Sequence, residues 1–149
     1  MSSLPDSLAA SAPRVVLDTN VALALFAYAD PTCAALARAL RERRLQAHAN
    51  AATRTEWLCV LARDRLGLDT DTRQCAQRAF DSLVITVDAS PVTPMRLPRC
   101  RDPDDQVFLE IARDLECVAL LTRDRQLLKL SKQTARSCGF RVCRPEEYP

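Results

Sequence analysis

The sequence predicts an α/β fold, in which a central parallel sheet of about five strands is covered on both faces by helices as a three-layer α/β/α sandwich. Short runs that are apolar throughout, such as 15–17 and 118–121, are typical of strands buried on both faces. These runs alternate along the chain with stretches of helical periodicity. Such alternation indicates right-handed crossovers around one sheet.

The order of the expected elements follows from local patterns along the chain. Arg41, Arg43 and Arg44 suit a helix C-terminus, Gly67 is a candidate left-handed cap, and branched residues favour a strand from Val84. The expected elements are a strand at 15–17, helices at 21–29 and 31–44, a strand at 45–49, helices at 51–66 and 71–83, a strand at 84–87, a helix at 104–115, a strand at 118–121, a short helix at 126–130 and a strand at 140–143.

Single residues complete this assignment. The helix at 51–66 has Leu58, Leu61 and Ala62 on one face, and the helix at 104–115 has an apolar set at helical spacing. Between strand 84–87 and that helix, three prolines enforce an irregular connection: Pro91, Pro94 and Pro98. Residues 1–13, rich in Ser, Ala and Pro, are expected to form a flexible leader before a single domain at 14–149.

Composition excludes several classes of protein. The chain has 149 residues, 48% of them hydrophobic, which is enough for one core without a metal or disulfide staple. Twenty-one basic and 19 acidic residues give a formal charge of +2, which argues against a highly basic nucleic-acid binder. Gly67 and Gly139 are the only glycines, so neither a Walker loop nor a dinucleotide-binding fingerprint can be built.

Cysteine and histidine usage narrows the chemistry further. The 7 cysteines never form a C-x-x-C pair and lie among apolar neighbours, so we expect reduced thiols in a cytoplasmic protein rather than zinc ligands. No signal peptide is recognisable, and the apolar runs are too short to span a bilayer. His48 is the sole histidine and is expected near a strand end, so histidine-based catalysis would depend on that one residue.

Four carboxylates are expected to meet at the carboxyl edge of the sheet. Asp18 and Asp124 follow strands, Asp105 begins a helix, and Glu56 lies in the first turns of another. Carboxylates this close repel one another unless a cation neutralises them, and oxygen ligands without His or Cys select Mg²⁺ or Mn²⁺.

A purely structural interpretation stays open for several of these acids. Asp18 and Asp124 are favoured helix caps, and Asp102-Pro103-Asp104-Asp105 has the pattern of a cap, a first-turn proline and first-turn acids. Glu56 fits this interpretation least, because its helix neighbours three and four residues away offer no ion pair.

Taken in order, these motifs resemble the PIN-domain ribonucleases, including the VapC-type toxins of bacterial toxin-antitoxin systems. The matching residues are Asp18-Thr19-Asn20, Glu56, Asp102 to Asp105, and Thr122-Arg123-Asp124. The resemblance implies a sheet ordered three-two-one-four-five and metal-dependent cleavage of RNA. It implies catalytic and metal-binding roles for Asp18, Glu56, Asp105 and Asp124, with Asn20, Asp102 and Thr122 as supporting residues and Asp104 as the fallback ligand. Gln126 departs from the pattern, since close relatives often have Asp there.

The negative cleft needs cations to admit an RNA backbone. The candidates flank the motifs: Arg54, Arg99, Arg101, Arg123 and Arg125, about half of which we expect to be ordinary solvated arginines. If the protein is a toxin, the resemblance implies a small antitoxin partner and a homodimer formed by helices. The alternative is a PIN-like domain that binds RNA or protein without catalysis. A haloacid-dehalogenase-like phosphatase is excluded because Asn20 stands where its second Asp is required.

Overall fold

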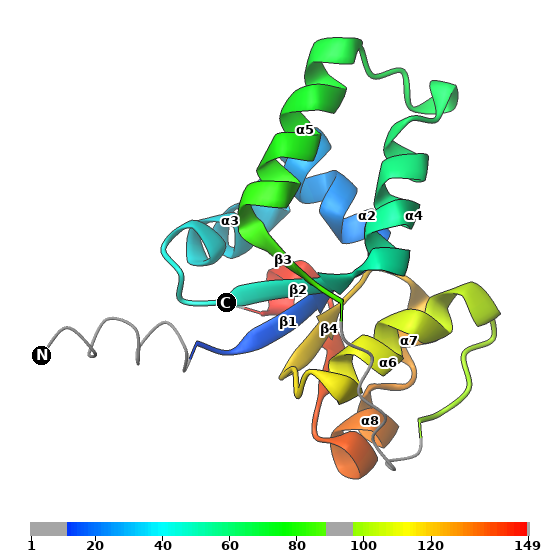
Figure 1. Ribbon diagram of the computed structural model, residues 1–149. Helices are drawn as coiled ribbons and strands as arrows, with labels where there is room; N and C mark the ends of the chain where they lie inside the picture. The colour runs from blue at the N-terminus through cyan, green and yellow to red at the C-terminus, as the bar shows by residue number, and fades with distance from the viewer. Residues whose placement is uncertain (1–11, 89–96, 149) are drawn as a thin grey trace, which may run out of the picture.

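Five parallel strands form the centre of the molecule, in the order β3-β2-β1-β4-β5 (Figure 1). The structure is a computed structural model that describes residues 12–88 and 97–148. The strands are β1 (Arg14–Leu17), β2 (Gln46–Asn50), β3 (Val84–Val87), β4 (Ala119–Leu121) and β5 (Arg141–Cys143). The predicted α/β/α fold, its parallel sheet and the strand order are confirmed.

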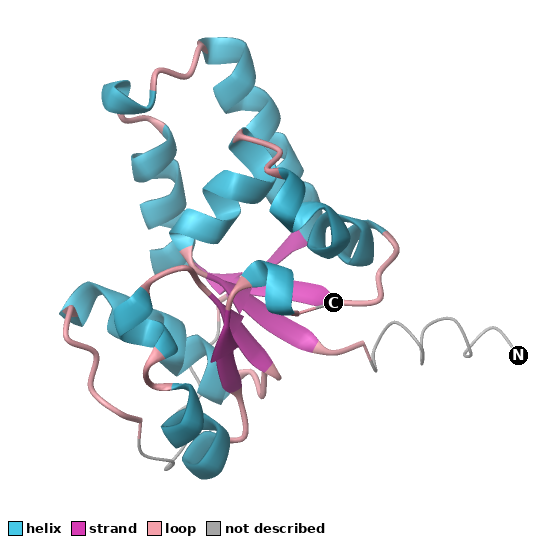
Figure 2. Cartoon of the chain, turned by 180° about the vertical axis from the view of Figure 1, so that it is seen from behind, coloured by secondary structure: helices cyan, strands magenta, loops and turns pink. Residues whose placement is uncertain are grey.

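Helices connect successive strands, and one short helix follows the last strand. They are α2 (Thr19–Ala22), the π-helical segment η1 (Leu23–Ala27), η2 (Pro31–Cys33), α3 (Ala34–Arg41), α4 (Ala51–Leu61), η3 (Asp64–Leu66), α5 (Thr70–Leu83), η4 (Pro103–Asp105), α6 (Gln106–Asp114), α7 (Arg125–Leu128), α8 (Ser131–Cys138) and η5 (Pro145–Glu147). Seen from behind, the sheet lies between these helical layers (Figure 2).

Alternation along the strands divides the core into two parts, one on each face of the sheet. Val15 and Leu17 of β1 pack with the helices from α2 to α5, whereas Val16 packs with α6, α7 and the segment around Phe140. Because successive side chains of a strand point to opposite faces, a strand that is apolar throughout must be covered on both sides. Because all five strands run parallel, their carboxyl ends share one edge of the sheet.

The helix expected at 51–66 differs from the observed one. The α-helix α4 ends at Leu61, Arg63 is extended, and the short helix η3 closes on Gly67 with φ of 66°. The face that it buries holds Thr53, Trp57 and Leu61, and Ala62 is exposed. Aromatic packing determines which face of α4 is buried, because Trp57 stacks on Phe80 of α5 at 5.1 Å between ring centroids.

The C-terminal part holds a helix that the sequence did not predict. The helix α8 has a polar sequence, with only Thr134 buried, and its helical pattern is correspondingly weak. Gly139 caps it with φ of 79°. Residues 1–11 of the expected leader, and Pro91 and Pro94 of the expected irregular connection, lie outside the described residues. The division into a leader and one domain stays a prediction.

Among residues 12–88 and 97–148, no single helix has the length and hydropathy of a membrane span. The bent pair Thr19–Ala27 and Pro31–Arg41, with 103° between its two parts, meets those criteria only when the parts are taken together. All seven cysteines are free thiols.

His48 lies in the middle of β2 rather than at its end, and its ring is buried. Its Nδ1 has no hydrogen-bond partner among the described residues. Burial, and then the positive charge of Arg14, hold the pKa of His48 below its ordinary value. The unfolded chain therefore binds the proton more readily, so this contribution to stability is complete above about pH 6.5 and is lost as the pH falls.

Replacing His48 with Gln, which cannot titrate, is expected to reduce the acid sensitivity of the fold. Melting temperatures measured from pH 7.5 to 5 should fall less steeply for His48→Gln than for the wild type. Comparing the two proteins at each pH cancels the contributions of the carboxylates, which are common to both. Parallel profiles would contradict this role for His48.

Candidate active site

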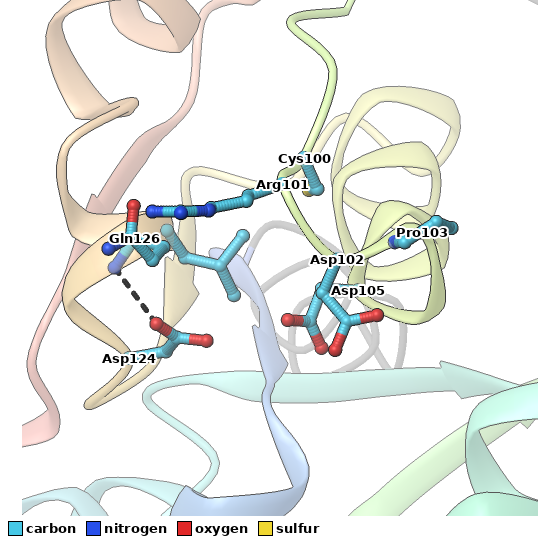
Figure 3. Close-up of a pocket in the computed structure, with 8 residues that line it drawn as sticks. Cys100, Arg101, Asp102, Pro103, Asp105, Asp124 and Gln126 are labelled. Atoms are coloured by element: carbon cyan, nitrogen blue, oxygen red, sulfur yellow. Dashed lines mark hydrogen bonds between the residues drawn. The ribbon is translucent and has the colours of Figure 1, made fainter.

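Four carboxylate residues meet at the carboxyl edge of the sheet, as the sequence predicts. Asp18 directly follows β1, and Asp124 lies between β4 and α7. Glu56 lies in the second turn of α4, and Asp105 ends η4 at the start of α6. A cavity of about 450 Å³ opens here and has Asp102, Asp105 and Asp124 in its wall (Figure 3).

Asp18 is the most tightly held of the four, with only 6% of its surface exposed. Its Oδ2 accepts hydrogen bonds from Thr122 Oγ1 at 2.6 Å and from Asn20 Nδ2 at 3.3 Å, and its Oδ1 accepts one from the Thr19 backbone N–H at 2.7 Å. Burial raises the pKa of Asp18, and Glu56 and Asp124 add to the rise, although the bonds from Thr122 and Thr19 oppose it. These contacts place Asn20 and Thr122 beside the carboxylate.

Asp105 has the most perturbed carboxyl group of the cluster. Burial, followed by the charges of Asp18, Asp102, Asp124 and Glu56, raises its pKa to about 7. A carboxyl group whose pKa rises in this way is adjacent to other negative charge in a poorly hydrated place. Asp104 is exposed and does not line the cavity. The geometry therefore favours Asp105 over Asp104 as the inward-facing acid.

Glu56 is positioned by the N-terminal cap of its helix and by a hydrogen bond to its side chain. Asn50 caps α4 by accepting from the Thr53 backbone N–H at 2.9 Å, while Thr53 Oγ1 accepts from the Asn50 N–H at 3.1 Å. This reciprocal cap fixes where α4 begins. Thr19 Oγ1 then donates to Glu56 Oε2 at 2.7 Å. Thr19 was missed as a site residue, although its place between Asp18 and Asn20 was a usable signal.

The acids also cap helices, so the structural interpretation holds beside the functional one. Asp18 caps α2, Asp102 Oδ1 accepts from the Asp104 N–H at 3.0 Å, and Asp124 Oδ1 accepts from the Gln126 N–H at 2.8 Å. In Figure 3 the second oxygen of Asp124 points toward Asp102 and Asp105. Capping occupies one oxygen of Asp124 and leaves the other facing the cavity.

The donor set suits a hard divalent cation. Carboxylate oxygens are the ligands that Mg²⁺ and Mn²⁺ prefer. Burial is the main cause of the raised pKa of Asp105, and repulsion from the neighbouring acids, which such a cation would offset, adds to it. In the part of the chain that the structure describes, no three His, Cys, Asp or Glu side chains are already gathered around one ion position. Binding would therefore have to draw Asp18, Asp105 and Asp124 closer together.

Comparison with protein families agrees with the observed fold. The model of the PIN domain family matches residues 14–126, most of the chain. The chain belongs to the PIN domain family. PIN domains are generally nucleases and usually use divalent metal ions. A search of curated proteins finds no match.

The five arginines expected around the cleft of this PIN domain fall into two groups, those paired with an acid of the chain and those at or near the cavity. Arg54 is paired with Asp81 through two hydrogen bonds of 2.9 and 3.0 Å, and Arg123 is paired with Asp30 at 3.0 Å. These two arginines pair with carboxylates of their own chain. Their contact with RNA stays a prediction. Arg101 lines the cavity, and Arg99 and Arg125 are exposed.

Two uncharged residues of this PIN domain were also missed by sequence reasoning. Cys100 lines the cavity, where burial and then the nearby aspartates raise the pKa of its thiol to about 11. Gln106 Oε1 accepts from the Cys100 N–H at 2.8 Å, and its Nε2 donates to the Pro98 carbonyl at 3.1 Å. A glutamine at the start of an amphipathic helix has no sequence signal that distinguishes it from a solvated one.

Proposed function

We propose that the protein is a metal-dependent endoribonuclease. The observation that carries the proposal is the meeting of Asp18, Glu56, Asp105 and Asp124 at one edge of the sheet. There burial, and then the charges of the neighbouring acids, raise the pKa of Asp105 to about 7. A fold keeps such a repulsive cluster chiefly where a cation is bound. Caps alone would not require four acids from distant parts of the chain to interact.

The chain's own residues would hold and orient the reacting groups. Asp18, Asp105 and Asp124 would hold Mg²⁺ or Mn²⁺, with Glu56 beside them. When bound, such an ion lowers the pKa of water and stabilises negative charge on phosphate oxygens. Thr122 and Asn20 fix the Asp18 carboxylate, and Thr19 fixes Glu56. Asp102 stabilises the turn that presents Asp105.

RNA is supported as the substrate by the charges around the cavity. Arg101 lies in its wall, and Arg99 and Arg125 are exposed on the adjoining segments. Arginine binds phosphate with a planar, bidentate fork. Cleavage at internal sites of single-stranded RNA is the activity we expect.

The decisive assay follows cleavage of a labelled single-stranded RNA with Mg²⁺, with Mn²⁺ and with EDTA. We expect cleavage only with a metal, and a loss of about 100-fold or more for Asp124→Asn, since an electrostatic catalytic group is worth several kcal/mol. Glu116→Gln is the matched control, because Glu116 is an exposed acid between α6 and β4, at the opposite, amino-terminal edge of the sheet. Equal cleavage by the wild type and Asp124→Asn would overturn the mechanism, whereas binding without cleavage would favour a non-catalytic RNA-binding domain.

The further proposal is that this nuclease is the toxin of a VapC-like toxin-antitoxin pair and acts in the cytoplasm as a homodimer. An apolar cavity of about 470 Å³ between η1, α3 and α5, lined in part by Leu25, Phe26 and Leu83, supports partner binding on this face. Induced expression in bacteria should arrest growth, and Asp124→Asn should abolish the arrest. Unchanged growth with abundant active nuclease would contradict the toxin role.

A further inference from the structure

The cavity beside the carboxylates is larger and more apolar than metal and phosphate chemistry alone requires. Its volume of about 450 Å³ falls within the range of small-molecule sites. Asp102, Asp105 and Asp124 are on its acidic side, but Cys100, Pro103 and Leu127 also line it. A phosphodiester bound to metal has no use for such surface, whereas the flat face of a base does.

We propose that this cavity is a nucleobase pocket, and that Arg101 and Gln126 make it selective for guanine next to the scissile phosphate. The inference rests on the proposed ribonuclease function and adds to it a sequence preference. Arg101 and Gln126 both line the cavity, and Figure 3 shows the Arg101 side chain extending toward Gln126. They are supplied by segments on either side of the cavity, before η4 and in α7.

The polar groups of these two side chains are available to a ligand. Within the described residues, neither the Arg101 guanidinium nor the Gln126 side-chain amide has an ion pair or hydrogen bond. The bond between Gln126 and Asp124 is donated by the backbone N–H of Gln126 and leaves its side chain free. Arginine supplies donors alone, and the amide supplies donors and one acceptor. Guanine offers two adjacent acceptors, N7 and O6, and arginine is their commonest protein partner. Adenine places a donor where O6 would be, which fits this donor-rich pair less well.

The pocket is built before RNA arrives. Gln106 joins the Cys100 N–H and the Pro98 carbonyl, and so fixes the segment that leads into Arg101. On the other side, Leu127 is 1% exposed and anchors α7 in the core, while Asp124 caps its first turn. Because the walls are already fixed, little conformational entropy is lost when a base binds. Differences in the contacts that each base makes should then appear as differences in cleavage rate.

The test measures base preference separately from overall rate. Short single-stranded RNAs that differ only at the base beside one cleavable bond are digested with Mn²⁺ by the full-length protein. We expect the wild type to favour guanine by about 5-fold to 150-fold, the value of one good bidentate contact. Arg101→Ala and Gln126→Ala should bring the four bases to within about threefold of one another.

Matched variants separate recognition from charge and from folding. Arg101→Lys keeps the charge but loses the fork, so its KM for RNA should stay near the wild-type value while guanine preference falls. Gln77→Ala, an exposed glutamine of α5, should keep both rate and preference. Binding of the same RNAs to an Asp18→Asn background, followed by fluorescence anisotropy, should show the same order of bases.

The outcomes are distinct. Metal-dependent cleavage without base preference, or with a preference unchanged in the Arg101 and Gln126 variants, would overturn the pocket and leave the ribonuclease function standing. A wild type that cleaves no RNA with any metal would overturn both. A preference for another base that disappears in these variants would overturn the assignment to guanine.

Discussion

Asp105→Asn should inactivate the nuclease and at the same time stabilise the metal-free protein at pH 8. Burial and four neighbouring acids raise the pKa of Asp105 to about 7, from an ordinary value of 3.8. Between these two values the folded protein keeps a proton that the unfolded chain releases, so stability falls as the pH rises through this range. Above pH 7 the ionised carboxylate of Asp105 lowers the free energy of unfolding by its full amount, and the neutral amide of asparagine removes this destabilisation.

We expect Asp105→Asn to gain about 1–2 kcal/mol in the free energy of unfolding at pH 8 in EDTA, after allowance for solvent screening. The gain should disappear near pH 4, where the wild-type carboxyl is protonated as well. Cleavage should drop by about 100-fold or more, because the proposed mechanism assigns Asp105 to holding the cation. Urea unfolding at the two pH values, and the RNA assay, measure both effects.

Metal titration completes this test. Mg²⁺ or Mn²⁺ should raise the melting temperature of the wild type, since a ligand that binds only the folded state stabilises it. The rise should be much smaller for Asp105→Asn, whereas Asp104→Asn, the exposed neighbour, should keep both the rise and the activity. An equal rise in all three proteins would show that Asp105 is not part of the metal site.

The fold and the acidic cluster were predictable for a shared reason. Apolar runs such as Val15 to Leu17 and Val118 to Leu121 are explained only by strands buried on both faces, and a parallel sheet then gathers whatever follows its strands at one edge. Asp18 and Asp124 followed from that geometry alone. Glu56 and Asp105 lie on helices, and their inward orientation depends on caps at Asn50 and Asp102.

The features that sequence reasoning missed depend on contacts between distant segments. No local pattern in the sequence predicts that Arg54 pairs with Asp81 or that Arg123 pairs with Asp30. Both ion pairs are formed in the structure. The same holds for Gln106, whose partners are backbone groups of an irregular segment. Local patterns report periodicity and capping, whereas pairing across elements is decided by the packing of the helices.

Trp57→Ala should cause the largest loss of stability among single substitutions in the layer that carries Glu56. Trp57 is 1% exposed and stacks on Phe80 at 5.1 Å between centroids, and Phe26 contacts both rings edge-on. Truncating a buried aromatic residue removes its transfer free energy and leaves a cavity, which together cost about 3–5 kcal/mol. Against a total stability of about 5–15 kcal/mol, a large part of the fold's margin is lost.

Trp57→Phe is the matched variant and should cost much less, about 1–2 kcal/mol, because one ring still packs against Phe80. The indole Nε1 of Trp57 has no hydrogen-bond partner among the described residues, so phenylalanine gives up no hydrogen bond there. Urea unfolding followed by far-UV circular dichroism measures both variants, since Trp57 is the only tryptophan and its fluorescence is lost with it. A cost below about 1 kcal/mol for Trp57→Ala would mean that the cluster of Phe26, Trp57 and Phe80 does not hold α4 and α5 in place. Because Glu56 precedes Trp57 on α4, the same packing sets the position of that carboxylate, and Trp57→Ala should reduce the nuclease activity of the molecules that remain folded.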